Sequence, residues 1–296
     1  MPHADVTGQV DALREGRAFA DLSAWRKVRV AGSEAAEWLN DLLSAELSGL
    51  APGASRRSLL LSPTGRIRAD LTVAATGLGT VLIQDPSQPA PIDELLSPYV
   101  LSSDVALADV TDELALIAVP GTDQAPPVPR ADVLRPSCLG VGLDVLAPAE
   151  RAAEIRQALS GLLEAGPHAL EAWRIERGVA RFGVDVGEAS LPQEAGLDVV
   201  VAYQKGCFLG QEAMARVRNL GHPPFVVLAA GGDGPARAGE AVLAGDEPVG
   251  SVTSAVPLRN GGAATIVRIR WAAREAELRT ADGTVLRPSG AASGAA

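Results

Sequence analysis

The stretch RRSLLLSPTGRIRADLTVAA, residues 56–75, predicts a β-hairpin around which the rest of the fold can be arranged. An apolar run leads into a Pro-Thr-Gly turn at residues 63–65, and apolar and polar residues alternate after the turn. Successive side chains of a strand point to opposite faces, so one face is expected to carry Ile67, Ala69, Leu71 and Val73. The other face is expected to carry Arg68, Asp70 and Thr72.

The flanking sequence predicts helices and short strands on both sides of this hairpin. In VRVAGSEAAEWLNDLLSAELSGL, residues 28–50, a short strand precedes a helix that opens near Ser33, whose hydroxyl is suited to cap it. Further strands are expected at Thr80–Gln84, Val105–Val110, Leu114–Val119 and Gly142–Leu146. Further helices are expected at Ile92–Tyr99, Ala149–Glu164 and His168–Arg177. Helices interleaved with hairpins predict the α+β class, with helices packed on mainly antiparallel sheet.

The pattern of apolar and polar residues changes after NLGHPP, residues 219–224. From Phe225 to Pro288, short alternating runs are separated by glycine-rich turns, which predicts a small barrel or sandwich. We therefore expect one region over residues 1–222, a C-terminal β-barrel over residues 223–288, and a disordered tail over residues 289–296.

Composition excludes several classes of protein. The chain of 296 residues carries a formal net charge of −10, which opposes broad binding to a nucleic-acid backbone. No apolar run approaches the roughly 20 residues of a membrane span, and the first residues do not resemble a signal peptide. Two cysteines 69 positions apart form no disulfide framework, so a cytoplasmic location is expected. The three histidines show no paired spacing, so no metal site is expected. Neither a dinucleotide fingerprint nor a P-loop is present.

A second stretch, YQKGCFLGQE at residues 203–212, combines two rare residues. Lys205 is one of only two lysines and Cys207 one of only two cysteines. Residues 211–219 have helical composition, so Cys207 would precede a helix N-terminus, where the helix dipole and the ammonium of Lys205 both favour a thiolate. Gly206 and Gly210 bracket the entry, where tight backbone geometry or a close ligand is expected. The alternative is that Cys207 is a small buried apolar residue and Lys205 a solvated charge.

The pattern K-G-C-F-x-G-Q-E closely resembles the signature of the YgfZ branch of the folate-binding proteins related to the glycine-cleavage T-protein. The segments VAGSEAAEWLNDLLSAEL, LLSPTGRIRADLTV, WRIERGVARFGVDV and VGSVTSAVPL also resemble parts of that family, so the likeness runs from Val28 to the end of the barrel. This resemblance implies two ferredoxin-like domains that form a channel for tetrahydrofolate, plus the small barrel.

The resemblance also implies roles for single residues. Asp70 falls where the aminomethyltransferase relatives keep a catalytic aspartate, and Cys207 and Lys205 would be essential to the action, with a thiolate at the channel mouth. Asp144 looks like a pterin-binding carboxylate, which would accept hydrogen bonds from the amidine-like edge of the ring. The other residues that the resemblance assigns to folate binding are Arg174, Glu176, Gly206, Gly210, Gln211, Glu212 and Arg216. For Asp70 and Asp144 the alternative is an ordinary surface or strand-end charge, and for Arg174 and Glu176 a structural salt bridge.

Three functions follow from these expectations. The first is a YgfZ-like protein that binds tetrahydrofolate and supports the assembly, maintenance or repair of iron–sulfur enzymes, including tRNA-modifying ones. Those enzymes would be its client proteins, and it would not be a turnover enzyme of the ordinary kind. The second is a true aminomethyltransferase of the glycine cleavage system, in which Asp70 is the key carboxylate. Three features favour the first: the cysteine signature, the absence of the G-Y-T-G-E turn that those transferases carry before the position of Asp144, and Leu170, which replaces an arginine of the transferases. Ala69 stands where those relatives have a further aspartate. The third is a channel for another acidic cofactor, or for none.

Overall fold

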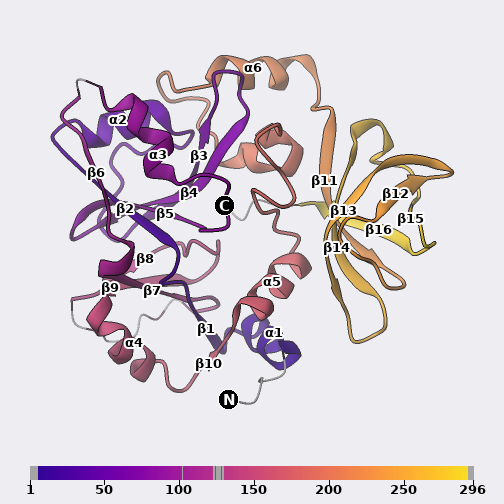
Figure 1. Ribbon diagram of the computed structural model, residues 1–296, viewed down its shortest axis with the longest axis horizontal. Helices are drawn as coiled ribbons and strands as arrows, with labels where there is room; N and C mark the ends of the chain where they lie inside the picture. Colours follow the sequence, from indigo (N-terminus) through magenta and orange to yellow (C-terminus); the bar gives the residue numbers. More distant parts are fainter. Residues whose placement is uncertain (1–5, 102, 123, 125–127, 129, 293–296) are drawn as a thin grey trace.

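The computed structural model describes residues 6–101, 103–122, 124, 128 and 130–292. Figure 1 shows a sheet at the upper left, a second sheet below it and a barrel at the right. The chain thus has a mixed α/β architecture in which two ferredoxin-like sheets are joined to a closed C-terminal barrel. The predicted fold class is confirmed.

The first sheet is built around the predicted hairpin, and all its neighbouring strands are antiparallel. Its strands, in spatial order, are β3 (Ser55–Leu61), β4 (Ile67–Thr76), β5 (Gly79–Gln84), β2 (Arg26–Ala31) and β6 (Ala106–Asp109). Helix α2 (Ala35–Leu42) and helix α3 (Ile92–Leu96) pack on one face through a common apolar core. A 3-10 turn at Ser97–Tyr99 prolongs α3, as the expected helix Ile92–Tyr99 requires.

The second sheet draws its strands from distant parts of the chain. In spatial order they are β10 (Leu163–Glu164), β1 (Ala18–Asp21), β7 (Leu114–Val119), β9 (Leu143–Pro148) and β8 (Asp132–Leu134). One face is covered by α4 (Ala152–Ala158), which a 3-10 turn at Ala149–Arg151 precedes. The other face shares an apolar core with the first sheet, to which Leu116 and Leu134 contribute from one side and Val81 and Ile83 from the other. Burial of this shared core holds the two sheets together.

Two helices and a long connection lie between the sheets and the barrel. Helix α1 (Val6–Arg14) packs on α5 (Pro167–Glu176), and Figure 1 shows α5 beside the barrel. Short 3-10 turns follow at Pro192–Ala195 and Leu197–Val200, and another lies earlier at Thr111–Glu113. Helix α6 (Gln211–Leu220) then leads to the barrel.

The barrel closes on itself, so its core is surrounded by paired strands. Its strands, in spatial order, are β11 (Phe225–Gly232), β14 (Ala263–Arg270), β13 (Glu247–Pro257), β12 (Ala241–Ala244), β15 (Leu278–Thr280) and β16 (Val285–Ala291). A 3-10 turn at Trp271–Ala273 separates β14 from β15. Over the described ranges, no helix is long and apolar enough to cross a lipid bilayer.

Three local expectations are corrected. The helix expected at Ala149–Glu164 ends at Ala158, because the chain turns at Ser160 and Gly161 and residues 163–164 pair with β1. Ser33 does not cap α2: its hydroxyl donates to Asp104 Oδ2 at 2.6 Å. Strand β16 runs to Ala291, which is three residues into the segment expected to be disordered, and residues 293–296 of that segment lie outside the described part.

Candidate functional site

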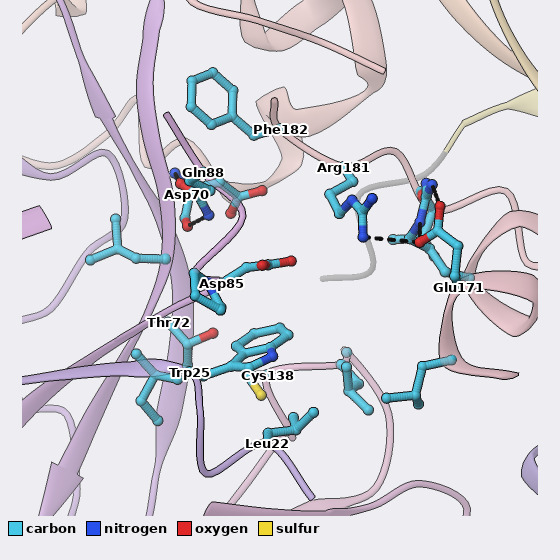
Figure 2. A pocket seen from close by; sticks show the side chains of 18 of the residues that line it. Leu22, Trp25, Asp70, Thr72, Asp85, Gln88, Cys138, Glu171, Arg181 and Phe182 are labelled. Carbon is cyan, nitrogen blue, oxygen red and sulfur yellow. Dashed lines mark hydrogen bonds and ion pairs between the residues drawn. The ribbon is translucent and has the colours of Figure 1, made fainter. Parts of the chain in front are cut away.

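A cavity of about 380 Å³ lies where the two sheets meet α5. Its walls come from β4 and β5, the β1–β2 connection, the loop around Cys138, α5 and the segment that follows α5 (Figure 2). Cavities of this size bind small organic molecules, and the mixture of apolar walls with a few polar groups is typical of such sites. It is therefore the candidate ligand site.

Asp70 lies in this cavity, as the alternation along its strand indicated. Its carboxylate forms a two-point contact with Arg57 of β3, in which Nε lies 2.8 Å from Oδ1 and Nη2 lies 2.5 Å from Oδ2. The main chain of Asp70 is bound on both sides by the Gln88 amide, which donates to its carbonyl and accepts from its N–H at 3.1 Å. Two-point ion pairs fix orientation, so this carboxylate is held rigidly inside the cavity.

The apolar floor of the cavity includes Trp25, whose ring Figure 2 shows between Thr72 and Cys138. The loop that carries Trp25 is fixed from behind by Lys27, which is fully buried. Lys27 Nζ donates to the carbonyl oxygens of Ser23 at 2.6 Å and Trp25 at 2.9 Å. Burial lowers the pKa of Lys27 to about 8. One of the two lysines thus holds a cavity wall without entering the cavity.

The opposite wall carries Arg174, which connects α5 to the barrel. Arg174 pairs with Glu171 at 2.5 Å and with Asp185 at 2.7 Å, and it donates to Ser254 Oγ at 2.9 Å. Asp185 is buried and also accepts from the hydroxyls of Thr253 at 2.6 Å and Ser254 at 2.7 Å. The V-T-S stretch of the barrel is therefore explained by its docking onto α5 and the segment after it.

Asp144 does not line the cavity, although the resemblance implies that it contacts the pterin. It is fully buried, and its carboxylate accepts from Ser137 Oγ at 2.5 Å and from the Cys138 N–H at 2.8 Å. Burial raises the pKa of Asp144 to about 6 and that of the Cys138 thiol well above its ordinary value. Asp144 holds the Ser137–Cys138 loop, and it is Cys138 that reaches the cavity.

Glu176 is also outside the cavity, because its side chain turns to Arg14 of α1. The Glu176 carboxylate accepts from Arg14 Nε at 3.0 Å and from Nη2 at 2.5 Å. Of the expected R-x-E pair, only Arg174 lines the cavity. Glu176 therefore forms a structural salt bridge with Arg14, which was the alternative to a role in ligand binding.

Lys205 and Cys207 are adjacent in sequence but face different surroundings. The ammonium of Lys205 is buried and donates to the carbonyl oxygens of Asn40 at 2.5 Å, Leu43 at 2.5 Å and Ala45 at 2.7 Å. These carbonyls lie at the C-terminal end of α2, where a cation is favourable. Burial lowers the pKa of Lys205 to about 8. Cys207 is exposed. Neither residue lines the cavity, so Cys207 lies on the surface, on a loop that Lys205 anchors, and not at the mouth of this cavity.

The remaining residues of the signature belong to the packing of α6 and not to the cavity lining. Gly210 precedes α6 with a φ of 84°, and a Cβ there would lie 2.5 Å from the Ser62 carbonyl oxygen of the hairpin. Only glycine fits that approach at this backbone angle. A Cβ on Gly206 would meet nothing within 4 Å. The others expected to bind folate are partly or fully exposed on α6 and also lie outside the cavity: Gln211, Glu212 and Arg216.

Several residues that line the cavity were not expected from the sequence: Trp25, Asp85, Gln88, Glu171, Arg177 and Arg181. Asp85 and Gln88 follow β5 in a turn, and the two arginines follow the end of α5. The spacing R-G-V-A-R at residues 177–181 was the one available signal, since glycine at a helix end brings the next residues back towards the helix. Within the described residues, no group of three or more His, Cys, Asp or Glu side chains could hold a metal ion.

Comparisons with known proteins agree with this architecture. The GCVT N-terminal domain model matches residues 2–126. The aminomethyltransferase of Streptomyces coelicolor is 28% identical over 282 residues, which are 83% of this chain and 76% of the relative. That of Thermosynechococcus vestitus is 27% identical over 281 residues, 86% of this chain and 76% of the relative. The crystal structure of glycine cleavage system aminomethyltransferase T from Bartonella henselae superposes with a TM-score of 0.80 at 19% identity, covering 95% of this chain and 87% of that one.

Proposed function

We propose that this protein binds tetrahydrofolate between its two sheets. The domain match, the aminomethyltransferase relatives and the shared fold support a relationship to the glycine-cleavage T-protein superfamily, and the proposal starts from that relationship. The observation that carries the proposal is the cavity of about 380 Å³, which has Asp70 fixed by Arg57 on one wall and Trp25 on its floor. A flat pterin ring suits contact with an indole, and its N–H groups suit an orienting carboxylate.

Aminomethyl transfer is the activity that the relatives favour, because those named above are aminomethyltransferases. In this reaction a one-carbon unit passes from an aminomethyl group on a lipoyl carrier to tetrahydrofolate; the carbon–sulfur bond breaks, and ammonia and the dihydrolipoyl carrier with its free thiol are released. Asp70 is the residue suited to act, since a carboxylate held rigidly beside the acceptor stabilises positive charge that develops during the transfer. Two departures from those transferases remain: Ala69, which precedes Asp70 and is buried in the core of the first sheet, and Leu170, which lines the cavity wall.

A second candidate is the YgfZ-like role, in which the folate-bound protein supports iron–sulfur enzymes as its clients. The observation that favours it is the exposure of Cys207 within K-G-C-F-x-G-Q-E. An accessible thiol outside the folate cavity can meet a protein client, whereas a thiol inside it could not. Lys205 would serve this role by fixing the loop that presents Cys207.

Folate binding itself is tested by anaerobic calorimetry with the purified protein. We expect saturable binding of tetrahydrofolate, and we expect Asp70→Asn to weaken it because the variant disturbs the two-point contact with Arg57. The absence of affinity for any reduced folate would overturn the proposal.

The two activities are separated by a second pair of assays. Release of ammonia from an aminomethylated lipoyl carrier and tetrahydrofolate, lost in Asp70→Asn, supports the transferase. Restoration of iron–sulfur enzyme activities in a deletion strain by the wild type but not by Cys207→Ser supports the second role. Gln204→Ser is the matched control, because Gln204 is exposed on the same loop. Cys138→Ser is a poor control, because Cys138 lines the cavity.

A further inference from the structure

Several charged side chains lie among the mainly apolar residues of the cavity wall, and most of them are neutralised by a neighbour. The ion pairs that involve cavity residues are Arg57–Asp70, Arg174–Glu171, Arg181–Glu171, Arg174–Asp185 and Arg156–Asp21. A charge that is removed from water without a counter-ion is costly, so pairing is the expected state of such groups. A partly buried charge in this wall that has no ion-pair partner is therefore available to pair with a ligand.

Asp85 is an unpaired anion in the wall. Its carboxylate accepts from the Ser87 N–H at 2.8 Å, within the turn that follows β5. Among the described residues, no basic side chain forms an ion pair with it. Figure 2 shows the Asp85 carboxylate directed into the open space of the cavity, on the same side as Asp70 and Gln88.

Arg177 is the unpaired cation. Its guanidinium stacks over the Trp173 ring, 4.4 Å from the centroid, and Nη1 donates to the Leu139 carbonyl oxygen at 3.2 Å. No acidic group in the described part of the chain forms an ion pair with it. The side chain is half-buried, and burial lowers its pKa. A neighbouring cation, Arg181, pairs with Glu171 but leaves its own buried Nε without a hydrogen-bond partner.

The two unpaired charges lie on different walls. Asp85 directly follows β5 of the first sheet, whereas Arg177 follows α5 at the other side, where Figure 2 places Arg181 and Glu171. A ligand that satisfied both would need hydrogen-bond donors at one end and an anion at the other. A molecule with an anion alone, such as inorganic phosphate, would leave Asp85 unsatisfied.

We propose that Asp85 and Arg177 are the charges that contact the bound ligand, Asp85 accepting from a donor-rich ring edge and Arg177 binding a carboxylate at the other end. The inference rests on the proposed function, under which the ring is the pterin of tetrahydrofolate and the carboxylate belongs to its glutamate. Asp85 thus takes the role that the resemblance implied for Asp144. Arg177 suits the second role because a guanidinium can bind both oxygens of a carboxylate.

The experiment compares a ligand that carries the glutamate carboxylates with one that lacks them. Tetrahydropteroate has the same pterin and aminobenzoate as tetrahydrofolate but lacks the glutamate. Anaerobic calorimetry measures the affinity of both ligands for the wild type, Arg177→Met and Asp85→Asn. Asparagine keeps an oxygen for the Ser87 N–H, so the turn is preserved. Arg274→Met is the matched control, because Arg274 stacks over Trp271 in the barrel at 4.5 Å.

We expect the wild type to bind tetrahydrofolate at least about tenfold more tightly than tetrahydropteroate, the factor that one hydrogen bond to a charged group supplies. Arg177→Met should abolish this preference without changing the affinity for tetrahydropteroate, and Arg274→Met should keep it. Asp85→Asn should lower the affinity for both ligands by a similar factor.

The following results would overturn the inference while leaving folate binding intact. These are equal affinity of the wild type for both ligands, a preference for tetrahydrofolate that survives in Arg177→Met, and unchanged affinities in Asp85→Asn. Equal weakening of both ligands in Arg177→Met would make Arg177 a structural residue and also refute its role. If neither ligand binds the wild type, the proposed function fails and the inference fails with it.

Discussion

Replacement of Lys205 by methionine tests whether this lysine is an anchor of the fold. The ammonium donates to three carbonyl oxygens at the end of α2, and the bonds to Leu43 and Ala45 are buried. A buried carbonyl that loses its donor costs about 1–3 kcal/mol. Two such groups give about 2–6 kcal/mol, and water can satisfy the third carbonyl, that of Asn40. We therefore expect Lys205→Met to lower the free energy of unfolding by about 3 kcal/mol.

The assay is urea unfolding followed by tryptophan fluorescence, since Trp38 on α2 lies next to the affected carbonyls in sequence. Gln204→Met is the control, because it places the same new side chain on the exposed neighbouring position and should change the free energy of unfolding by less than about 0.5 kcal/mol. A solvated catalytic lysine would behave like that control. If Lys205→Met unfolds within about 0.5 kcal/mol of the wild type, the anchoring role is refuted.

Three further predictions concern stability. Gly210→Ala should destabilise the protein by about 2 kcal/mol, because its positive φ and the approach of Ser62 both exclude a Cβ, whereas Gly206→Ala should be neutral in the same urea unfolding assay. Asp185→Ala should cost about 3 kcal/mol and loosen the barrel, because it removes the buried acceptor that joins the barrel to α5; calorimetric unfolding that stays unchanged would contradict this. Burial raises the pKa of Asp144 from 3.8 to about 6, so the folded state binds the proton more tightly than the unfolded state. Protonated Asp144 therefore contributes about 3 kcal/mol to the free energy of unfolding below about pH 4, and this contribution is lost as the pH rises through 6. If the free energy of unfolding of Asp144→Asn has the same pH dependence as that of the wild type, the prediction is contradicted.

Local patterns in the sequence were sufficient for much of the fold. Alternation on either side of a Pro-Thr-Gly turn predicted the hairpin of β3 and β4, and short runs between glycines predicted the barrel. By contrast, β1 was not expected. It pairs with β10 through Ala18 and Leu163, which are far apart in the sequence. No local pattern records such a partner.

The candidate site was predicted only in part, for the same physical reason. Asp70 could be assigned to the correct face because alternation fixes the face of a strand residue. Lys205 could not be assigned correctly, because the carbonyls that bind it are about 160 residues away in sequence. Asp85 and Arg177 lie after the ends of elements, where side-chain direction depends on tertiary packing and not on periodicity.

The most direct test of the account is an anaerobic titration of the wild-type protein with tetrahydrofolate, followed by calorimetry and compared with Trp25→Ala. Trp25 lies on the cavity floor, so the account predicts saturable one-to-one binding that this variant weakens by at least about tenfold. Absence of saturable binding, or binding with the same affinity in Trp25→Ala, would show that the cavity between the two sheets is not the folate site.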